Sequence, residues 1–148
     1  KYLKVSEPVA VINEGLLRYL TFEEKRIVAQ NVYNLLSEFG GVWITCDVTP
    51  KKFIQNQDKN LPDFNKKLSD VTSRNDRFED INHIREFFGE IGFNNIEIHK
   101  FNEVKEELYS VNELGIVDEH VEKLLDDAIV AVMRISWNIK KIKYIYIK

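Results

Sequence analysis

The chain has 148 residues, a length typical of one domain, and it is 44% hydrophobic and 30% charged, as soluble globular proteins are. A formal net charge of −3 gives no reason to expect nucleic acid as a partner. The single cysteine, Cys46, excludes an intrachain disulfide, and no apolar run approaches the roughly 20 residues that cross a bilayer. We therefore expect a cytoplasmic protein without a membrane partner.

The first predicted element is a strand over Val9–Ile12, directly after Pro8. Four consecutive apolar residues, enriched in β-branched types, indicate a strand buried on both faces, as in parallel sheets. The polar pair Asn13 and Glu14 and then Gly15 end it. Glu14 would thus lie at the carboxyl end of a buried strand, where open α/β sheets bind their ligands.

A helix is predicted from Phe22 to Phe39. Thr21 and Glu24 have the spacing of a capping box, and Gly40 suits a left-handed C-terminal cap. Residues 41–47 then predict a second strand. A helical crossover of this length between two strands implies that they are parallel.

Residues 49–75 are polar with scattered apolar anchors, which predicts a long excursion or lid. A second helix follows over residues 77–91, with Gly92 at its end, and a strand with one solvated face over residues 94–101.

Three further elements are expected in the last third of the chain. Residues 104–127 are acidic and predict loop with a short helix over residues 117–125. Residues 128–135 are apolar except for Arg134, which predicts an interior strand. Residues 140–148 alternate and predict an extra terminal strand with lysine at both ends.

The run Asn13 to Leu20 reads N-E-G-L-L-R-Y-L and is followed by the helix and by the G-V-W-I-T-C-D strand. This combination resembles the class I S-adenosylmethionine-dependent methyltransferases of the leucine carboxyl methyltransferase and polyketide-type O-methyltransferase family. The resemblance extends from about Glu7 to Ile135 and begins at that family's fourth strand. It implies an α/β fold, the C-terminal half of a Rossmann-like sheet, mixed parallel with a terminal antiparallel hairpin.

The same resemblance implies S-adenosylmethionine as cofactor and a carboxylate or hydroxyl, on a small molecule or peptide, as methyl acceptor. In relatives the residue matching Glu14 lies against the methionine part of the cofactor. The glycine-rich turn of that family is missing, since the chain has six glycines and no G-x-G. Because the chain starts at Lys1 rather than Met, a longer product remains open.

Three residues are candidates for cofactor binding, each with an alternative. Glu14 can accept a hydrogen bond from an ammonium or hydroxyl; alternatively, it caps the helix region at Thr21 or is simply solvated. Asn13 lines the same pocket or serves the turn. Gly15 permits close backbone approach or makes a tight turn.

Three further residues are candidates for substrate binding. Arg18 could hold a substrate carboxylate with its guanidinium fork, although a surface arginine is the commoner case. Tyr19 is part packing and part pocket wall. Asp47 could line the acceptor pocket, whereas a strand-end aspartate that caps a turn is commoner.

No catalytic residue is assigned, because methyl transfer from a sulfonium needs positioning more than covalent help. Cys46 is expected to be a small buried hydrophobe, and the three histidines lack the spacing of a metal site.

Two functions follow. One is an O-methyltransferase-like protein that lacks the glycine-rich motif and relies on a missing N-terminal half. The other is an inactive remnant that acts as an oligomerisation or interaction module, because a sheet edge left by the missing strands must be covered. For this reason we expect a homodimer or a pairing with the extra strand at residues 142–148.

Overall fold

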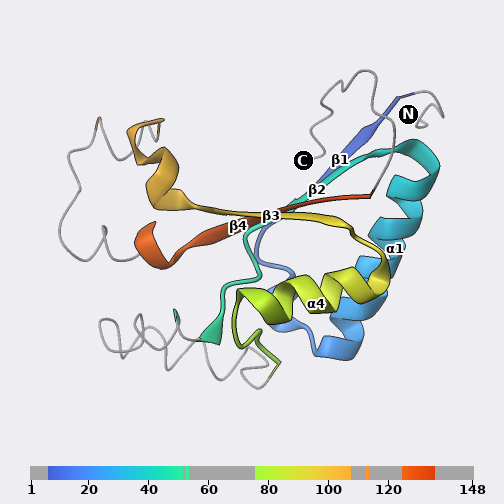
Figure 1. The fold of residues 1–148 in the computed structure, drawn as a ribbon, viewed down its shortest axis with the longest axis horizontal. Coiled ribbons are helices and arrows are strands. Elements are labelled where there is room, and N and C mark those ends of the chain that lie inside the picture. The colour runs from blue at the N-terminus through green and yellow to red at the C-terminus, as the bar shows by residue number, and fades with distance from the viewer. Residues whose placement is uncertain (1–6, 52, 54–75, 108–112, 114–124, 136–148) are drawn as a thin grey trace.

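The computed structural model describes residues 7–51, 53, 76–107, 113 and 125–135 (Figure 1). The strands are β1 (Val9–Asn13), β2 (Gly41–Thr45), β3 (Asn95–Lys100) and β4 (Ile129–Arg134). The helices are α1 (Phe22–Phe39) and α4 (Ile81–Ile91), with 3-10 turns η1 (Leu17–Tyr19) and η2 (Phe101–Glu107).

The four strands form one mixed sheet in the order β1-β2-β4-β3. β1 and β2 are parallel and joined through α1, whereas β4 runs antiparallel to both β2 and β3. The carboxyl ends of β1, β2 and β3 therefore meet at the same edge of the sheet. This confirms the predicted α/β class, with a mixed parallel sheet and a terminal antiparallel hairpin.

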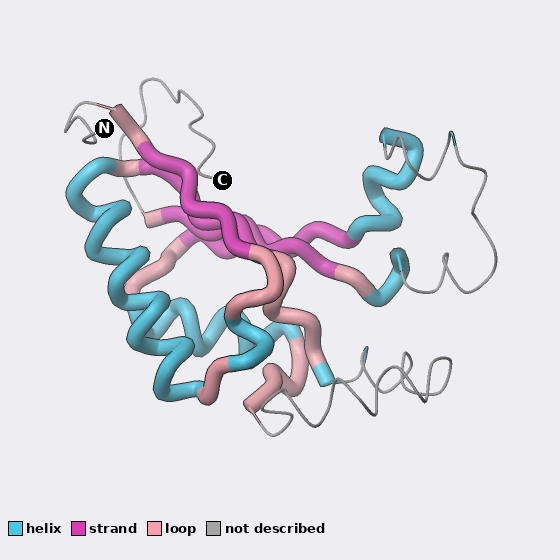
Figure 2. The backbone as a smooth tube through the Cα atoms, turned by 180° about the vertical axis from the view of Figure 1, so that it is seen from behind, coloured by secondary structure: helices cyan, strands magenta, loops and turns pink. Residues whose placement is uncertain are grey.

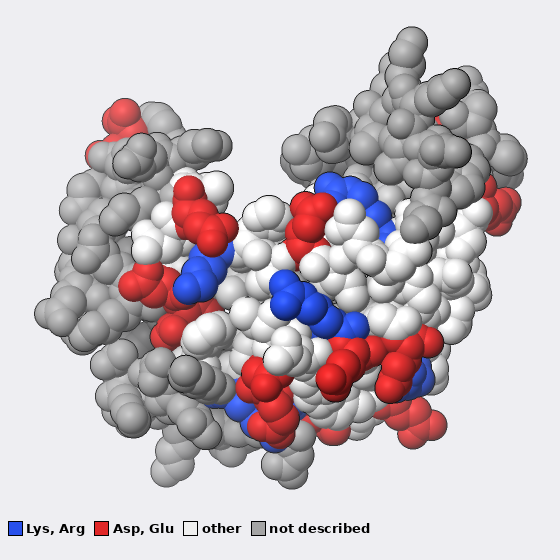
Figure 3. All heavy atoms as spheres, viewed as in Figure 1, with Lys and Arg blue, Asp and Glu red and all other residues white. Residues whose placement is uncertain are grey.

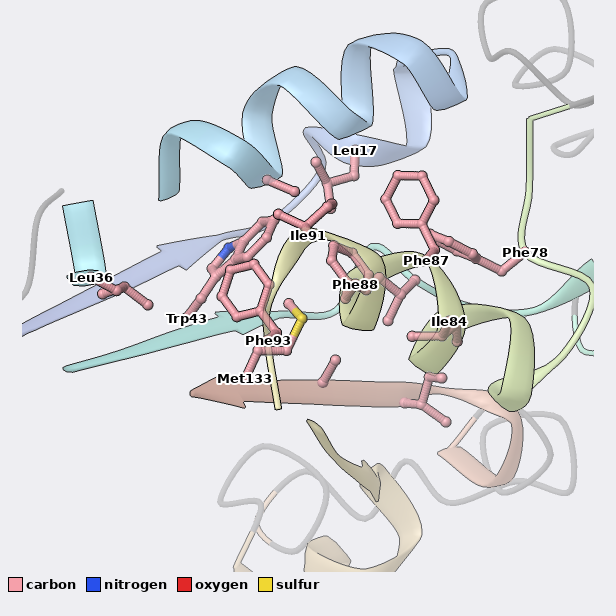
Figure 4. Packing of buried hydrophobic residues seen from close by; sticks show 14 of the residues in the cluster. Leu17, Leu36, Trp43, Phe78, Ile84, Phe87, Phe88, Ile91, Phe93 and Met133 are labelled. Carbon is pink, nitrogen blue, oxygen red and sulfur yellow. The ribbon is translucent and has the colours of Figure 1, made fainter. Parts of the chain in front are cut away.

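Both helices lie on one face of the sheet, as Figure 2 shows from behind. The apolar core fills the space between them and the strands (Figure 4). Trp43 of β2 is its centre: the side chain is fully buried, with Phe88 and Phe93 rings at 5.5 and 5.7 Å. Because side chains alternate along a strand, the core positions are the odd-numbered residues of β1, β2 and β4.

Helix α1 has the predicted bounds, and its capping box is present. The Thr21 hydroxyl accepts from the Glu24 N–H, while the Thr21 N–H donates to the Glu24 carboxylate at 2.8 Å. The expected left-handed cap at Gly40 is wrong: φ is 70°, but ψ is 175°, because the chain turns directly into β2. The Gly40 N–H still donates to the Leu36 carbonyl at 2.7 Å.

The capping box should make stability depend on acid. Hydrogen bonds from the Thr21 N–H and hydroxyl lower the pKa of the Glu24 carboxyl below 4.5. Because this pKa is lower in the folded state than in the unfolded state, the ionised carboxylate stabilises the fold at pH values above the unfolded-state pKa. This stabilisation is lost as the pH falls through the folded-state pKa. In urea unfolding, the stability difference between wild type and Glu24→Gln should therefore shrink below about pH 4.5.

The matched control is Glu23→Gln, one residue earlier in the same helical turn, which leaves the Thr21 contacts in place. A stability difference for Glu24→Gln that stays constant with pH, or equals that of the control, would contradict the prediction.

Two predicted boundaries and one prediction of burial need correction. Helix α4 begins at Ile81 rather than residue 77, because the Asp80 carboxylate accepts from the His83 N–H at 2.9 Å and caps the helix there. β2 ends at Thr45 rather than residue 47. The strand at residues 9–12 is buried on both faces only at its start, where Val9 and Ala10 are 5% and 6% exposed, whereas Ile12 is 49% exposed.

Ile12 lies near the carboxyl end of β1, on the sheet face that α1 and α4 do not cover, although Ala10 on the same face is buried. β1 pairs with β2 alone within the described part of the chain, and both described helices cover the opposite face. Several predicted segments lie outside the described residues: 54–75 of the excursion, the acidic helix at 117–124, and the terminal strand at 140–148.

Candidate functional site

The carboxylate of Asp47, just after the end of β2, determines the course of the turn between β1 and α1. Asp47 accepts from three successive backbone N–H groups: Gly15 at 2.8 Å, Leu16 at 2.7 Å and Leu17 at 3.0 Å. Its side chain is fully buried. Because Asp47 lies about thirty residues further along the chain, the turn is held by tertiary structure rather than by its own sequence.

Side chains complete the shell around the same carboxylate. Arg18 Nε and Nη2 lie 3.3 and 3.2 Å from Oδ1, and Asn13 Nδ2 donates to Oδ2 at 2.9 Å. A charge so buried is tolerated only when paired and hydrogen-bonded. The contacts of Asp47 and Arg18 are thus those of a turn cap and its counter-ion; their substrate roles stay predictions.

Asn13 links this cap to the core. Its Oδ1 accepts from Trp43 Nε1 at 2.7 Å, and its Nδ2 also donates to Thr45 Oγ1 at 3.0 Å. Thr45 Oγ1 in turn accepts from the Asp47 N–H at 3.2 Å. The amide of Asn13 is used on both its oxygen and its nitrogen, so its observed contacts are structural.

Sequence reasoning missed Trp43 and Thr45 as members of this network. The signal was available in the parallel register, which pairs Asn13 with Thr45 and places Trp43 two residues before it on the same face.

Glu14 is different, because it projects from the turn and is exposed. Among the described residues its carboxylate has no hydrogen-bond or ion-pair partner. Gly15 follows with φ +72°, in the left-handed region that favours glycine. The turn held by Asp47 therefore carries an exposed carboxylate, without a partner in the described segments, just beyond the carboxyl end of β1, where the sequence predicted it.

The turn also exposes three large apolar or neutral side chains beside the partly exposed Arg18. Ile12, Leu16 and Tyr19 are large side chains that are 49%, 44% and 44% exposed. Burial, with the Asp47 and Glu14 carboxylates nearby, raises the pKa of the Cys46 thiol. A raised pKa keeps the thiol protonated and poorly nucleophilic. Cys46 is only partly buried, so the expected full burial is wrong.

Charge elsewhere is mixed. On the face drawn in Figure 3, basic and acidic side chains alternate without a large field of either sign. The described segments contain no group of three or more His, Cys, Asp or Glu side chains that could hold a metal ion. They also contain no helix long and apolar enough to span a membrane.

Comparison with known proteins gives little. No family model matches the chain, and no curated protein matches it. One solved structure to which the chain shows a weak similarity is phosphoethanolamine N-methyltransferase 2 of Haemonchus contortus, bound to phosphomonomethylethanolamine and S-adenosylhomocysteine. The TM-score is 0.38 at 10% identity; the match covers 86% of this chain but 33% of that one. The chain thus spans about a third of the length of that structure.

Proposed function

We propose that this chain supplies one wall of the cofactor site of an S-adenosylmethionine-dependent O-methyltransferase. The observation that carries the proposal is the exposed Glu14 carboxylate, unpaired in the described structure and fixed at the tip of β1 by the buried Asp47 cap. The methyl acceptor would be a carboxylate or hydroxyl, as expected from the sequence resemblance.

Topology supports the position of this site. After β1, the chain passes through α1 to β2, which pairs with one edge of β1. No described strand pairs with the other edge. In doubly wound sheets, ligands bind at the strand tips where the strand order reverses. A second half built on the free edge of β1 would place that switch point beside Glu14.

The residues fit a cationic ligand. A carboxylate without a counter-ion accepts strong hydrogen bonds from an ammonium group, and the exposed Ile12, Leu16 and Tyr19 can contact apolar atoms. S-adenosylmethionine would supply the electrophilic methyl group. In this proposal, Glu14 orients the ligand by its ammonium, and the Asp47 cap keeps Glu14 in place.

The alternative function is an interaction module. The Val9 N–H donates to the Gly40 carbonyl, on the side of β1 that faces β2. Because the backbone groups of successive residues in a strand point to opposite sides, those of Ile12 point to the free edge. An exposed Ile12 beside backbone groups that pair with no described strand favours association with a second copy or with another part of a larger sheet. A chain that stays monomeric at high concentration in light scattering would count against this alternative.

Titration calorimetry of the whole chain with S-adenosylmethionine and S-adenosylhomocysteine tests the first function. We expect binding that Glu14→Gln weakens about tenfold or more, since a hydrogen bond to a charged group contributes about 1.5–3 kcal/mol. Glu86→Gln on the exposed side of α4 is the matched control and should leave affinity unchanged.

The outcomes separate the two functions. Binding that is equally strong in Glu14→Gln and wild type would overturn the role of Glu14. No binding at millimolar ligand, together with self-association, would favour the interaction module.

A further inference from the structure

Lys25, in the first turn of α1, is almost completely buried, with 2% of the residue exposed. Its side chain extends back past the start of the helix. Nζ donates to the Leu20 carbonyl and, at 2.7 Å, to the Asp76 carbonyl. The ammonium also lies 5.1 Å from the centre of the Phe22 ring.

This is an unfavourable place for a lysine. Burial disfavours its charge, and a helix N-terminus repels cations. Burial lowers the pKa of Lys25, against an opposing effect of the Asp76 carboxylate; Arg77 and Glu24 have smaller effects. A neutral amine would still offer two N–H donors to the two carbonyls, so the contacts do not depend on the charge.

The two carbonyls belong to segments that are far apart in the sequence. Leu20 directly follows η1 and closes the turn that Asp47 holds. Asp76 begins residues 76–79, here called the return segment. The return segment also contacts Lys51, which follows β2 in the chain. The Lys51 N–H donates to the Phe78 carbonyl at 2.8 Å, and Lys51 Nζ pairs with Glu79.

We propose that Lys25 is a positioning residue that joins the Asp47-held turn and the return segment into one unit that opens as a whole. The proposal goes beyond the proposed function, since it concerns how the turn is held rather than what binds there. It gives the buried amine a structural role, because each of its two hydrogen bonds fixes a different segment.

Native-state hydrogen exchange on the full chain tests this inference. The reporters are the amides of Leu16 and Leu17, bonded to Asp47, and of Lys51, bonded to Phe78. In the wild type they should exchange with a common opening free energy and a common denaturant dependence. Lys25→Met, which keeps the aliphatic stem, should speed exchange at both places by about tenfold or more.

Two controls make the result specific. Lys100→Met removes an exposed lysine on β3 and should change neither reporter group. The Gly40 amide, bonded to Leu36 at the far end of α1, should keep its protection in Lys25→Met.

Faster exchange at only one of the two places, or equal loss at Gly40, would overturn the proposal. If Lys25→Met does not fold, the wild type decides the matter: unequal opening free energies for the two reporter groups overturn it, and equal ones support it. No ligand enters the experiment, so its outcome is independent of any failure of the proposed cofactor binding.

Discussion

Replacement of Asp47 by alanine is expected to lower the free energy of unfolding by about 3–5 kcal/mol, because it leaves several hydrogen-bond donors around a fully buried side chain without an acceptor. The carboxylate accepts from three backbone N–H groups and two side chains. Without it, these donors lose their partner in a place where Leu17 is fully buried. Each unsatisfied buried group adds about 1–3 kcal/mol of desolvation cost.

Urea unfolding followed by far-ultraviolet circular dichroism measures this loss. Asp47→Asn should be less damaging, because one amide oxygen still accepts, although the amide NH₂ then faces donors. Asp126→Asn, on an exposed aspartate distant in sequence from the turn, controls for the loss of one charge. A stability loss below about 1 kcal/mol for Asp47→Ala would mean that the turn holds its form without the cap.

The second large effect is expected at Gly41, where β1 and β2 first pair. An added Cβ would lie 1.8 Å from the Val9 carbonyl oxygen, and φ is +123°. Both the clash with backbone and the strained φ oppose any side chain, and each contributes about 1–3 kcal/mol. Gly41→Ala should therefore cost about 3 kcal/mol or more and weaken the β1–β2 pairing.

Gly89→Ala is the matched control for this substitution. Gly89 lies inside α4, and a Cβ there meets nothing within 4 Å. Alanine is the better helix former by about 0.8–1 kcal/mol, so this variant should be neutral or more stable. Thermal unfolding of the two variants measures both effects. A shift of both midpoint temperatures in the same direction would contradict the prediction.

The fold was predictable where the determining interactions are local. Helix α1 has the expected bounds because its apolar stripe and its Thr21–Glu24 cap lie within a few residues. The parallel pairing of β1 and β2 followed from the crossover. The start of α4 was wrong, because Asp80 caps the helix within a segment whose apolar pattern begins earlier.

The site was predictable in its residues but not in their contacts. The strand-end position singled out Asn13, Glu14 and Asp47, yet sequence alone could not show that Asp47 reaches back about thirty residues to hold the turn. That contact depends on which strands are neighbours and in what register. Lys25 was invisible for the same reason, since in a helical pattern it reads as an ordinary solvated lysine.

Burial along β1 also depends on long-range structure, since Ala10 is buried and Ile12 is exposed on the same face. Four apolar residues in a row indicate burial, but how much each is buried is set by the elements on both sides of the strand. In this chain the described helices both lie on one side.

The way in which the turn is held has a consequence for protein engineering. Asp47 accepts hydrogen bonds from the main chain of residues 15–17 and not from the side chains of positions 14 and 16. The conformation of the turn therefore depends little on the residue types at those two positions. Variants randomised at positions 14, 16 and 19 should therefore stay folded, although the side chains at the tip of β1 differ. The chain offers a small scaffold on which new specificities could be selected.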